Sequence, residues 1–318
     1  MAKSVAWDER HLSRRLKLRD LRVLLTVARC GSMGKAAAEL AVSQPAISKA
    51  IADMEYALGV RLLDRSPQGV EPTIYARALL DRGVVVFDEL KQAVRHIEFL
   101  ANPAEGELRV GSTLAIGTAF FPAVVERFSE QYPRIVVHVL AGDGATIYRV
   151  LEERKADLVI APIRVSILKE HMQVDVLYDE SLVVVAGARS PWARRRKVKL
   201  AELVREVWTL PPLDGYLGPM IAEAFQAHGL EVPRVTVFSP NAPIRSGLVA
   251  TGRFLSIVPK SVVTFSGKNA PLKVLPIDLP TTREAMGIVT LKNRTLSPIA
   301  QLFVDCARDV ANTRTKRK

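Results

Sequence analysis

Apolar residues recur at helical spacing in three segments near the start of the chain. The first begins at Leu18, and its apolar positions are Leu21, Leu24, Leu25 and Ala28. The second covers residues 33–40, and its apolar side consists of Ala36, Ala37 and Leu40. The third covers residues 44–58, where about 100° per residue gives a buried stripe of Ile47, Ile51, Met54 and Leu58. This pattern predicts three short helices that pack against one another.

Capping residues separate the second and third helices. Ser32 and Ser43 precede the two helices and can accept hydrogen bonds from their free amides, and Gly59 ends the third. The face opposite the apolar stripe is small and polar, with one cation: Gln44, Pro45, Ser48, Lys49, Ala52 and Tyr56. Such a face suits a major groove, because Gln bonds adenine, Ser and Lys reach base edges or phosphate, and Pro contacts a thymine methyl. The alternative is an ordinary Ala-rich helical hairpin.

Two patterns follow the helices. Residues 60–73 form two short extended pieces around a Pro-Gln-Gly turn, which predicts a hairpin, the wing of a winged helix-turn-helix. Residues 74–101 contain no proline and predict one helix of about 40 Å. Its apolar positions alternate by four and three: Leu79, Gly83, Val86, Leu90, Ala93, Ile97 and Leu100. Such a heptad seam needs a partner helix, and a second subunit is favoured over the domain core.

Beyond Pro103 the pattern changes to strands that alternate with amphipathic helices, which predicts an α/β domain. Expected strands cover residues 107–110, 135–140, 158–160, 174–178, 182–186, 207–210, 235–238, 255–258 and 284–291. Helices are expected over residues 216–228 and 244–251 and from residue 297. The Ser-Pro-Trp sequence at 190–192 and the basic residues 194–199 suggest a crossing into a second lobe.

Composition narrows the class of protein. The chain has 318 residues with 45 Lys and Arg against 33 Asp and Glu, a net charge of +12 that favours a polyanionic partner. No apolar run approaches a membrane span, and residues 1–22 lack a signal-peptide core, so a cytoplasmic location is expected. Cys30 and Cys306 form no disulfide framework or metal cluster, and we expect no cofactor.

The literal residues between Leu21 and Arg65 resemble a known family. Gly31-Ser32, Ser43-Gln44-Pro45-Ala46-Ile47-Ser48 and Leu62-Leu63-Asp64-Arg65 are similar to the DNA-binding domain of LysR-type transcriptional regulators. Leu63 departs from the usual Phe, and Ile74-Tyr75-Ala76 from the usual Thr-x-Ala-Gly. By this resemblance Arg65 contacts the phosphate backbone or minor groove, although an ion pair with Asp64 or Glu71 is an alternative. The predicted DNA-binding residues are Ser32, Ser43, Gln44, Pro45, Ser48, Lys49 and Arg65.

The resemblance also implies a domain order. It gives a winged helix-turn-helix over residues 16–73, a linker and dimerisation helix over 74–102, and a two-lobed effector domain, like a periplasmic binding protein, over 104–312. Residues 313–318 are expected to be a disordered basic tail. The implied partners are promoter DNA, a small-molecule effector and further copies of the chain, as dimers paired into tetramers, with RNA polymerase as another candidate.

Effector-binding residues are expected at the carboxyl ends of strands near helix N-termini, where free amides favour an anion. Ser112 and Thr113 follow the first strand of the α/β domain and are expected to begin a helix, and family members commonly bind the effector there. Thr146, Pro211 and Asn241 occupy similar positions, with ordinary capping as the alternative. Arg245 could neutralise a carboxylate or phosphate, or pair with a surface acid. Residues 252–255 depart from the Gly-rich form usual in the family.

Other functions fit the sequence less well. An enzyme is disfavoured because the chain has no Gly-x-Ser-x-Gly, no phosphate-binding Gly-rich loop and no His-Glu-x-x-His. A solute-binding module would not need the 100 N-terminal residues. A nonspecific architectural DNA-binding protein, the main alternative, would not need base-reading residues such as Gln44 and Ser48 or a ligand-sized α/β domain. The sequence therefore predicts a regulator that binds specific DNA and responds to a small molecule.

Overall fold

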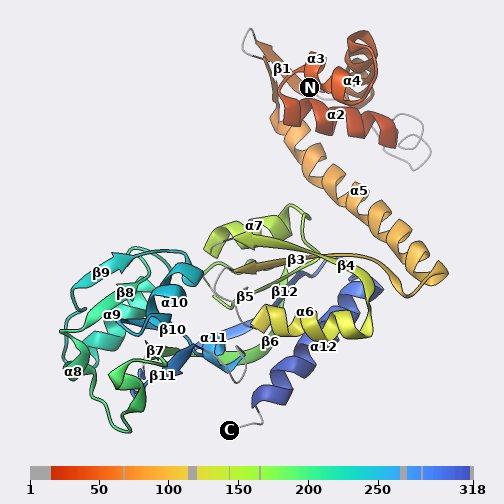
Figure 1. The fold of residues 1–318 in the computed structure, drawn as a ribbon. Coiled ribbons are helices and arrows are strands. Elements are labelled where there is room, and N and C mark those ends of the chain that lie inside the picture. Colours follow the sequence, from red (N-terminus) through yellow and green to blue (C-terminus); the bar gives the residue numbers. More distant parts are fainter. Residues whose placement is uncertain are drawn as a thin grey trace. The chain divides into compact units, whose positions relative to one another are not determined.

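The computed structural model describes residues 16–66, 69–113, 120–142, 144–164, 166–265, 271–280 and 282–315. The chain divides into two compact units, residues 1–93 and 94–318. Figure 1 follows the chain through its helices and strands.

The first unit is a helical domain with a small hairpin. Its elements are α2 (Leu18–Cys30), α3 (Met33–Glu39), α4 (Gln44–Leu58), β1 (Leu63–Ser66) and β2 (Gly69–Pro72), and β1 pairs antiparallel with β2. The three helices and the hairpin that the sequence predicts are therefore confirmed, while Pro67 and Gln68 of the expected turn lie outside the described residues. The capping predictions hold too, because the Ser32 and Ser43 hydroxyls each accept a backbone N–H and Gly59 adopts φ 67°.

The buried face of α2 differs from the predicted one. Leu21 and Leu24 are buried as expected, but Leu25 and Ala28 are only half-buried, and Val23 and Val27 are buried instead. The reason is that α2 contacts α3, α4 and β2, so its buried surface is wider than one helical stripe. On α4 the prediction is nearly right: Ile47, Ile51 and Met54 are fully buried and Leu58 half-buried.

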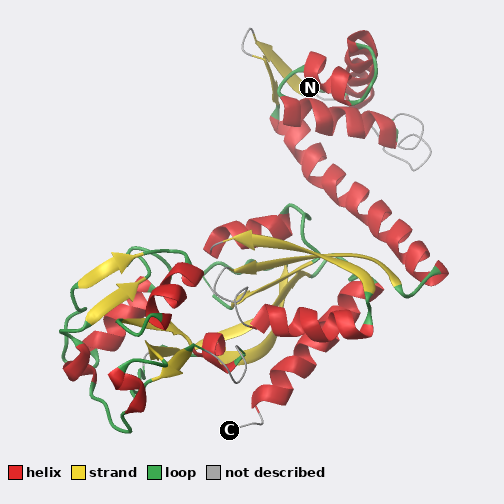
Figure 2. Ribbon diagram, in the orientation of Figure 1, coloured by secondary structure: helices red, strands yellow, loops and turns green. Residues whose placement is uncertain are grey.

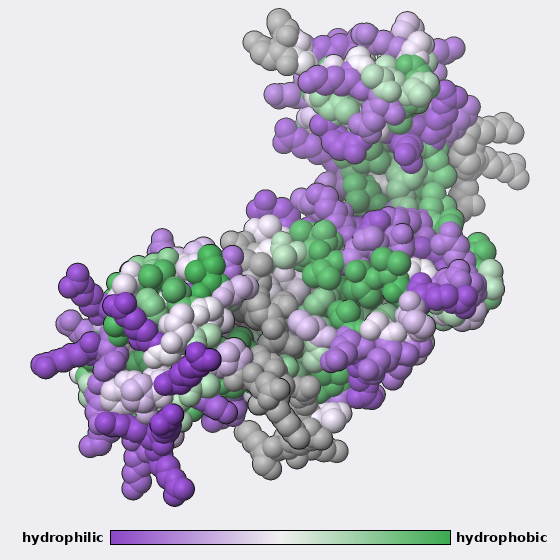
Figure 3. Space-filling model, viewed as in Figure 1, coloured by the Kyte–Doolittle hydropathy of each residue, from purple (hydrophilic) through white to green (hydrophobic). Residues whose placement is uncertain are grey.

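A single helix, α5 (Ile74–Ala101), has the bounds that the sequence predicts. Gly83 of its seam faces the same unit, because a Cβ there would lie 3.0 Å from Leu21 Cδ1. Its small size therefore serves packing within the chain, where a close approach of a second helix was expected. Further along, four apolar seam residues are exposed by 39–70%: Val86, Leu90, Ile97 and Leu100. Figure 3 shows apolar side chains along this part of the helix.

The second unit contains two five-stranded sheets, each of which forms the centre of a lobe (Figure 2). The first lobe has the strand order β4-β3-β5-β12-β6. These strands are β3 (Glu105–Thr113), β4 (Arg134–Gly142), β5 (Leu158–Pro162), β6 (Met172–Glu180) and β12 (Glu284–Leu291). Helices α6 (Phe120–Gln131) and α12 (Pro298–Thr315) pack into one core of the lobe, and α7 (Gly144–Glu152) packs into another.

The second lobe has the strand order β11-β7-β10-β8-β9. These strands are β7 (Leu182–Gly187), β8 (Val207–Leu210), β9 (Val235–Phe238), β10 (Phe254–Pro259) and β11 (Leu272–Val274). The helical elements of this part of the chain are η2 (Pro191–Arg194), α8 (Leu200–Leu203), α9 (Gly218–Gln226), α10 (Ala242–Ala250) and α11 (Lys260–Thr264). Both lobes bury apolar strands on two faces, so β5 and β7 are continuous apolar runs.

Three expectations about the second unit are corrected. The chain crosses into the second lobe at Ser181, between β6 and β7, because β7 pairs with β10 and not with the first sheet. The crossing was expected at residues 190–199, but residues 191–194 form η2 inside the second lobe. Ser112 and Thr113 belong to β3 and do not begin a helix.

The last correction concerns the C-terminus. A disordered tail was expected from residue 313, but the final helix continues to Thr315. Within that helix the Thr313 hydroxyl donates to the Asp309 carbonyl. Residues 316–318 lie outside the described residues. Over the described chain, no helix combines the length and apolarity needed to cross a bilayer.

Candidate functional site

The first candidate site is the exposed face of α4. Gln44 and Pro45 in its first turn are exposed, as are Lys49 and Tyr56, and Ser48 is half-buried. Ser43 caps this helix, and its hydroxyl accepts the amide of Ala46, which leaves the hydroxyl hydrogen free to donate to another acceptor. The structure thus presents the predicted small, polar face to solvent at the start of the helix. Contact of these residues with DNA stays a prediction.

Several cations of this unit are exposed, and three of them lie near the start of α3, on α4 and on the wing. Lys35, Lys49 and Arg65 are exposed, and none forms an ion pair with a described residue. Arg29 differs, because it pairs with Glu39. The alternative role of Arg65, an ion pair with Asp64 or Glu71, is therefore not present, although both acids lie on the same hairpin. These cations are available for phosphate.

The sequence did not indicate the part that Glu55 plays. Its carboxylate on α4 accepts the amide of Leu62 at 2.7 Å and that of Leu63 at 3.2 Å, where the chain enters β1. The amide of Val70 on β2 donates to the Gly31 carbonyl at 2.9 Å. The wing is thus held to the end of α4 and to the end of α2, so the two surfaces that would face DNA are fixed relative to each other.

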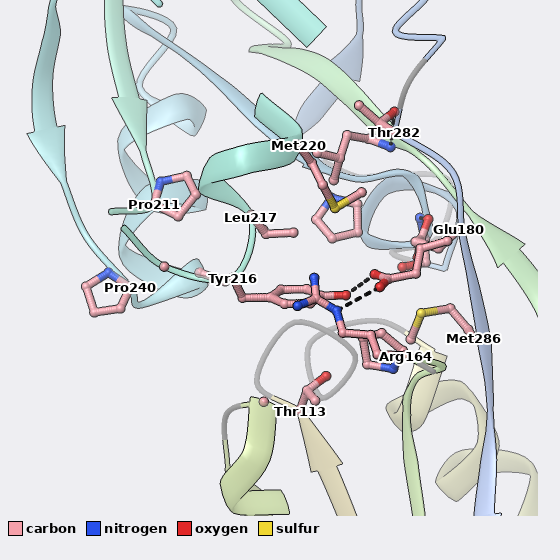
Figure 4. A pocket seen from close by; sticks show the side chains of 18 of the residues that line it. Thr113, Arg164, Glu180, Pro211, Tyr216, Leu217, Met220, Pro240, Thr282 and Met286 are labelled. Atoms are coloured by element: carbon pink, nitrogen blue, oxygen red, sulfur yellow. Dashed lines mark hydrogen bonds and ion pairs between the residues drawn. The ribbon is translucent and has the colours of Figure 1, made fainter. Parts of the chain in front are cut away.

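The second candidate site is a cavity of about 270 Å³ with walls from both lobes of the second unit. This volume lies near the lower end of the range for ligand pockets, about 300–1,000 Å³. Most of its wall is apolar, including Ile167, Leu182, Pro211, Pro212, Leu217, Met220, Pro240, Pro259 and Met286. Its polar and charged wall residues are Thr113, Tyr148, Arg164, Glu180, Tyr216, Arg245, Ser261, Thr282 and Glu284. Figure 4 shows several of these side chains around the cavity.

One cluster joins the two lobes across the cavity. Arg164, after β5, donates through Nε to Glu284 on β12 at 3.0 Å. Tyr216, which precedes α9 in the second lobe, donates its hydroxyl to the same carboxylate. The Arg164 guanidinium lies 3.7 Å from the centre of the Tyr216 ring, a cation–π contact that Figure 4 shows from the side. Movement of one lobe relative to the other would have to break these contacts.

The two crossings between the lobes lie beside the cavity. Glu180, at the end of β6, accepts the amides of Ser181 and Ser261, both at 3.1 Å. Burial raises the pKa of the Glu180 carboxyl, and its hydrogen bonds only partly offset this. On the second crossing, the Thr282 hydroxyl accepts the amide of Leu182 at 3.1 Å, which ties the two crossing segments together.

The structure brings three of the predicted effector residues to the cavity wall: Thr113, Pro211 and Arg245. Ser112 is absent from that wall because successive side chains of a strand point to opposite faces, and its buried hydroxyl donates to the Thr113 carbonyl. Thr146 is exposed on α7 and is not part of the wall either. Asn241 is the N-cap of α10, where it accepts the amide of Ile244, so its capping role is the one observed. These three residues are not part of the cavity wall, and effector binding by any of the six stays a prediction.

Sequence reasoning missed the charged cluster of the cavity. Arg164 follows a strand at its carboxyl end, so the rule that pointed to Thr113 could have found it. Glu284 and Tyr216 gave no such signal, because Glu284 begins a strand and Tyr216 lies in a loop, 68 residues from its partner. Within the described part of the chain, no group of three His, Cys, Asp or Glu side chains could hold a metal ion.

Two family models match the two units. The model described as a bacterial regulatory helix-turn-helix protein of the lysR family matches residues 18–77. The model described as the LysR substrate binding domain matches residues 101–312, which is most of the chain. The chain belongs to the LysR family. It is a LysR-type transcriptional regulator, with a helix-turn-helix DNA-binding domain and an effector-binding domain.

Individual LysR-family relatives match this chain over most of its length. The regulator GbpR of Azospirillum brasilense is 25% identical over 307 residues, covering 96% of this chain and 90% of the relative. TdcA of Escherichia coli is 26% identical and covers 93% of this chain and 94% of the relative. Both are named transcriptional regulators, and nothing among the matches supports the architectural alternative.

Solved structures show the same fold. A full-length OxyR variant from Pseudomonas aeruginosa has a TM-score of 0.63 at 21% identity, covering 93% of this chain and 97% of its own. Full-length CbnR in complex with its target DNA has a TM-score of 0.61 at 22% identity, covering 93% of this chain and all of its own. The two-lobed LysR architecture predicted from the sequence is thereby confirmed.

Proposed function

We propose that this LysR-type regulator binds promoter DNA as a dimer, through α4 and the wing, and that a small molecule in the cavity between the lobes changes how it binds. The observation that carries the proposal is the cavity itself, because its wall comes from both lobes. A molecule that contacts both lobes favours the arrangement that it fits. The Arg164–Glu284–Tyr216 cluster offers a contact that differs between such arrangements.

The proposed DNA contacts divide into two kinds. Gln44, Pro45 and Ser48 on the exposed face of α4 read bases, because amide, hydroxyl and apolar groups there suit base edges in a major groove. Ser32, Ser43, Lys49 and Arg65 contact phosphate, which positions the protein and carries little sequence information. The exposure of Gln44 and Pro45 at the start of α4, and of the cations Lys49 and Arg65, supports this division.

The proposed dimer uses α5. Val86, Leu90, Ile97 and Leu100 repeat at heptad spacing and are exposed, and a second α5 would cover them. Leu79 and Gly83 pack within the first unit, so the proposed contact begins beyond them. Pairing of dimers into tetramers and contact with RNA polymerase stay predictions from the family resemblance.

Nuclease protection tests the DNA part of the proposal. The purified chain is incubated with DNA from upstream of its own gene, at fixed near-physiological salt and with excess competitor DNA. A bounded protected region with an inverted repeat supports specific binding by a dimer. Diffuse protection that competitor removes would contradict it.

Sedimentation tests the dimer. Ile97→Lys places a charge on the exposed seam, and Glu98→Lys places one on an exposed neighbouring position of the same helix. We expect Ile97→Lys to shift the chain towards monomer and Glu98→Lys to leave its sedimentation unchanged. Equal behaviour of the two variants would count against α5 as the interface.

A further inference from the structure

Among the described residues of the cavity, one cation has no counter-ion. Arg245, in the first turn of α10, is 3% exposed and lines the cavity. One of its terminal nitrogens donates to the Ser239 carbonyl, and its buried Nε has no hydrogen-bond partner among the described residues. Burial lowers the pKa of this guanidinium, and no carboxylate of the described chain offsets that effect. A buried, incompletely paired guanidinium costs free energy unless an acceptor reaches it.

The other charged groups of the cavity are already balanced. Arg164 is paired with Glu284, which also accepts the Tyr216 hydroxyl. Glu180 accepts two backbone amides at 3.1 Å, which stabilise its carboxylate. An anion that enters the cavity therefore meets Arg245 as the wall cation that no described carboxylate pairs.

A second unsatisfied group lies on the opposite lobe. The Thr113 hydroxyl at the end of β3 is buried and has no hydrogen-bond partner among the described residues. It lines the same cavity, and Figure 4 shows it at the end of its strand. Arg245 belongs to the second lobe and Thr113 to the first, so one molecule that satisfies both would contact the two lobes together. The wall between them is mainly apolar.

The remaining donors restrict the kind of anion. Two amides in the first turn of α10 are occupied, since those of Ile244 and Arg245 donate to Asn241. A phosphate dianion needs several donors, whereas a carboxylate has one charge and fits a single guanidinium edge. A volume of about 270 Å³ suits a small molecule.

We propose that the effector is a small monocarboxylate with an apolar body, its carboxylate held by Arg245 and a second acceptor group, if it has one, bonded by Thr113. This inference rests on the proposed function of the cavity as the effector site. It assigns the class of ligand and the lobe that binds its charged end.

Acids and their primary amides test this assignment, because an amide keeps the shape of the acid and lacks its charge. Benzoate and benzamide, phenylacetate and phenylacetamide, and butanoate and butanamide are titrated into the full-length protein by calorimetry. We expect at least one acid to bind about 10- to 100-fold more tightly than its amide, as a charge-assisted hydrogen bond implies. Arg245→Gln should remove this preference.

Two further variants control for structural effects. Arg253→Gln removes the same charge from an exposed position just after α10 and should keep the preference. Arg245→Lys retains the charge and should keep part of it, so a general loss of stability at this position is separated from loss of charge. The ratio of acid to amide affinity is unaffected by the fraction of protein that is folded.

The outcomes separate this inference from the function that it rests on. Equal affinity for acid and amide, or a preference for the acid that survives in Arg245→Gln, would overturn the assignment and leave the cavity as a ligand site. The absence of binding by every acid at about 10 mM would also overturn it, because a Kd of about 1 mM is detectable there. Nuclease protection of promoter DNA, measured on the same protein, decides the DNA-binding function independently.

Discussion

Glu55 offers a test of how the recognition helix and the wing act together. Its carboxylate accepts the amides of Leu62 and Leu63, two residues that are 0% and 4% exposed. Glu55→Ala removes the acceptor and leaves both amides to find other partners. Glu55→Gln keeps one oxygen in place and removes only the charge.

The expected magnitudes follow from these two contacts. A hydrogen bond to a charged acceptor contributes about 1.5–3 kcal/mol and a neutral one about 0.5–1.5 kcal/mol, so Glu55→Gln should cost about 1–3 kcal/mol of local stability. Glu55→Ala should cost more, about 2–6 kcal/mol, because each of the two orphaned buried amides adds about 1–3 kcal/mol. Thr73 still donates to the Leu62 carbonyl at 2.9 Å, so the wing loosens without detaching. We expect affinity for the specific DNA site to fall about three- to tenfold in Glu55→Ala.

Electrostatics alone predicts the opposite effect of Glu55→Ala on DNA affinity. Removing an acid near DNA lowers its repulsion from phosphate, which should raise affinity. Glu71→Gln is the matched control, because Glu71 is exposed on β2 and has no ion-pair partner among the described residues. This control should raise affinity slightly on any DNA, while the Glu55 variants lower it on the specific site.

The assays are gel-shift titration on the protected DNA fragment and amide exchange of residues 60–66 followed by mass spectrometry. Faster exchange in this segment, together with weaker specific binding, supports the coupling of helix and wing. The reasoning is refuted if Glu55→Ala and Glu71→Gln raise affinity alike, or if exchange of residues 60–66 is unchanged.

The remaining predictions concern single side chains. Gln44→Ala should reduce discrimination at one base pair by about 1–3 kcal/mol, and Lys49→Ala should weaken binding to all DNA and flatten its salt dependence, as competition and salt titrations can measure. The Asp157 carboxylate lies 3.0 Å from each of two arginines, Arg95 and the buried Arg294. Asp157→Asn should therefore lower the free energy of unfolding by about 3–5 kcal/mol. Asp175→Asn, which breaks the more exposed ion pair with Arg308, should lower the free energy of unfolding by less than about 1 kcal/mol. Denaturant unfolding of the two variants measures this difference. Burial raises the pKa of Glu180, so the folded protein binds a proton there more tightly than the unfolded chain. The contribution of Glu180 to the free energy of unfolding therefore falls as the pH rises above its ordinary pKa of 4.5. Glu180→Gln should therefore melt higher relative to wild type as pH rises, and an unchanged difference between pH 4 and 8 would contradict this.

The sequence by itself determined the local elements and the family. Caps at Ser32 and Ser43, the glycine at 59 and the unbroken run over residues 74–101 predicted helix bounds well, because capping and periodicity act over a few residues. The same residues that carry these signals also carry the resemblance to LysR regulators, so the sequence predicted both the family and the proposed DNA-reading face of α4.

Tertiary structure alone decided how distant segments meet. Strand β12 pairs antiparallel with β5 and β6 across more than 100 residues, and Arg164 meets Glu284 over a separation of 120. Nothing in a local pattern encodes such pairs. The crossing at Ser181, the exclusion of Ser112 from the cavity and the packing of Gly83 on Leu21 depend on which faces the assembled sheets and helices bury. Sequence periodicity gives the face of an element, and only the folded chain determines what that face meets.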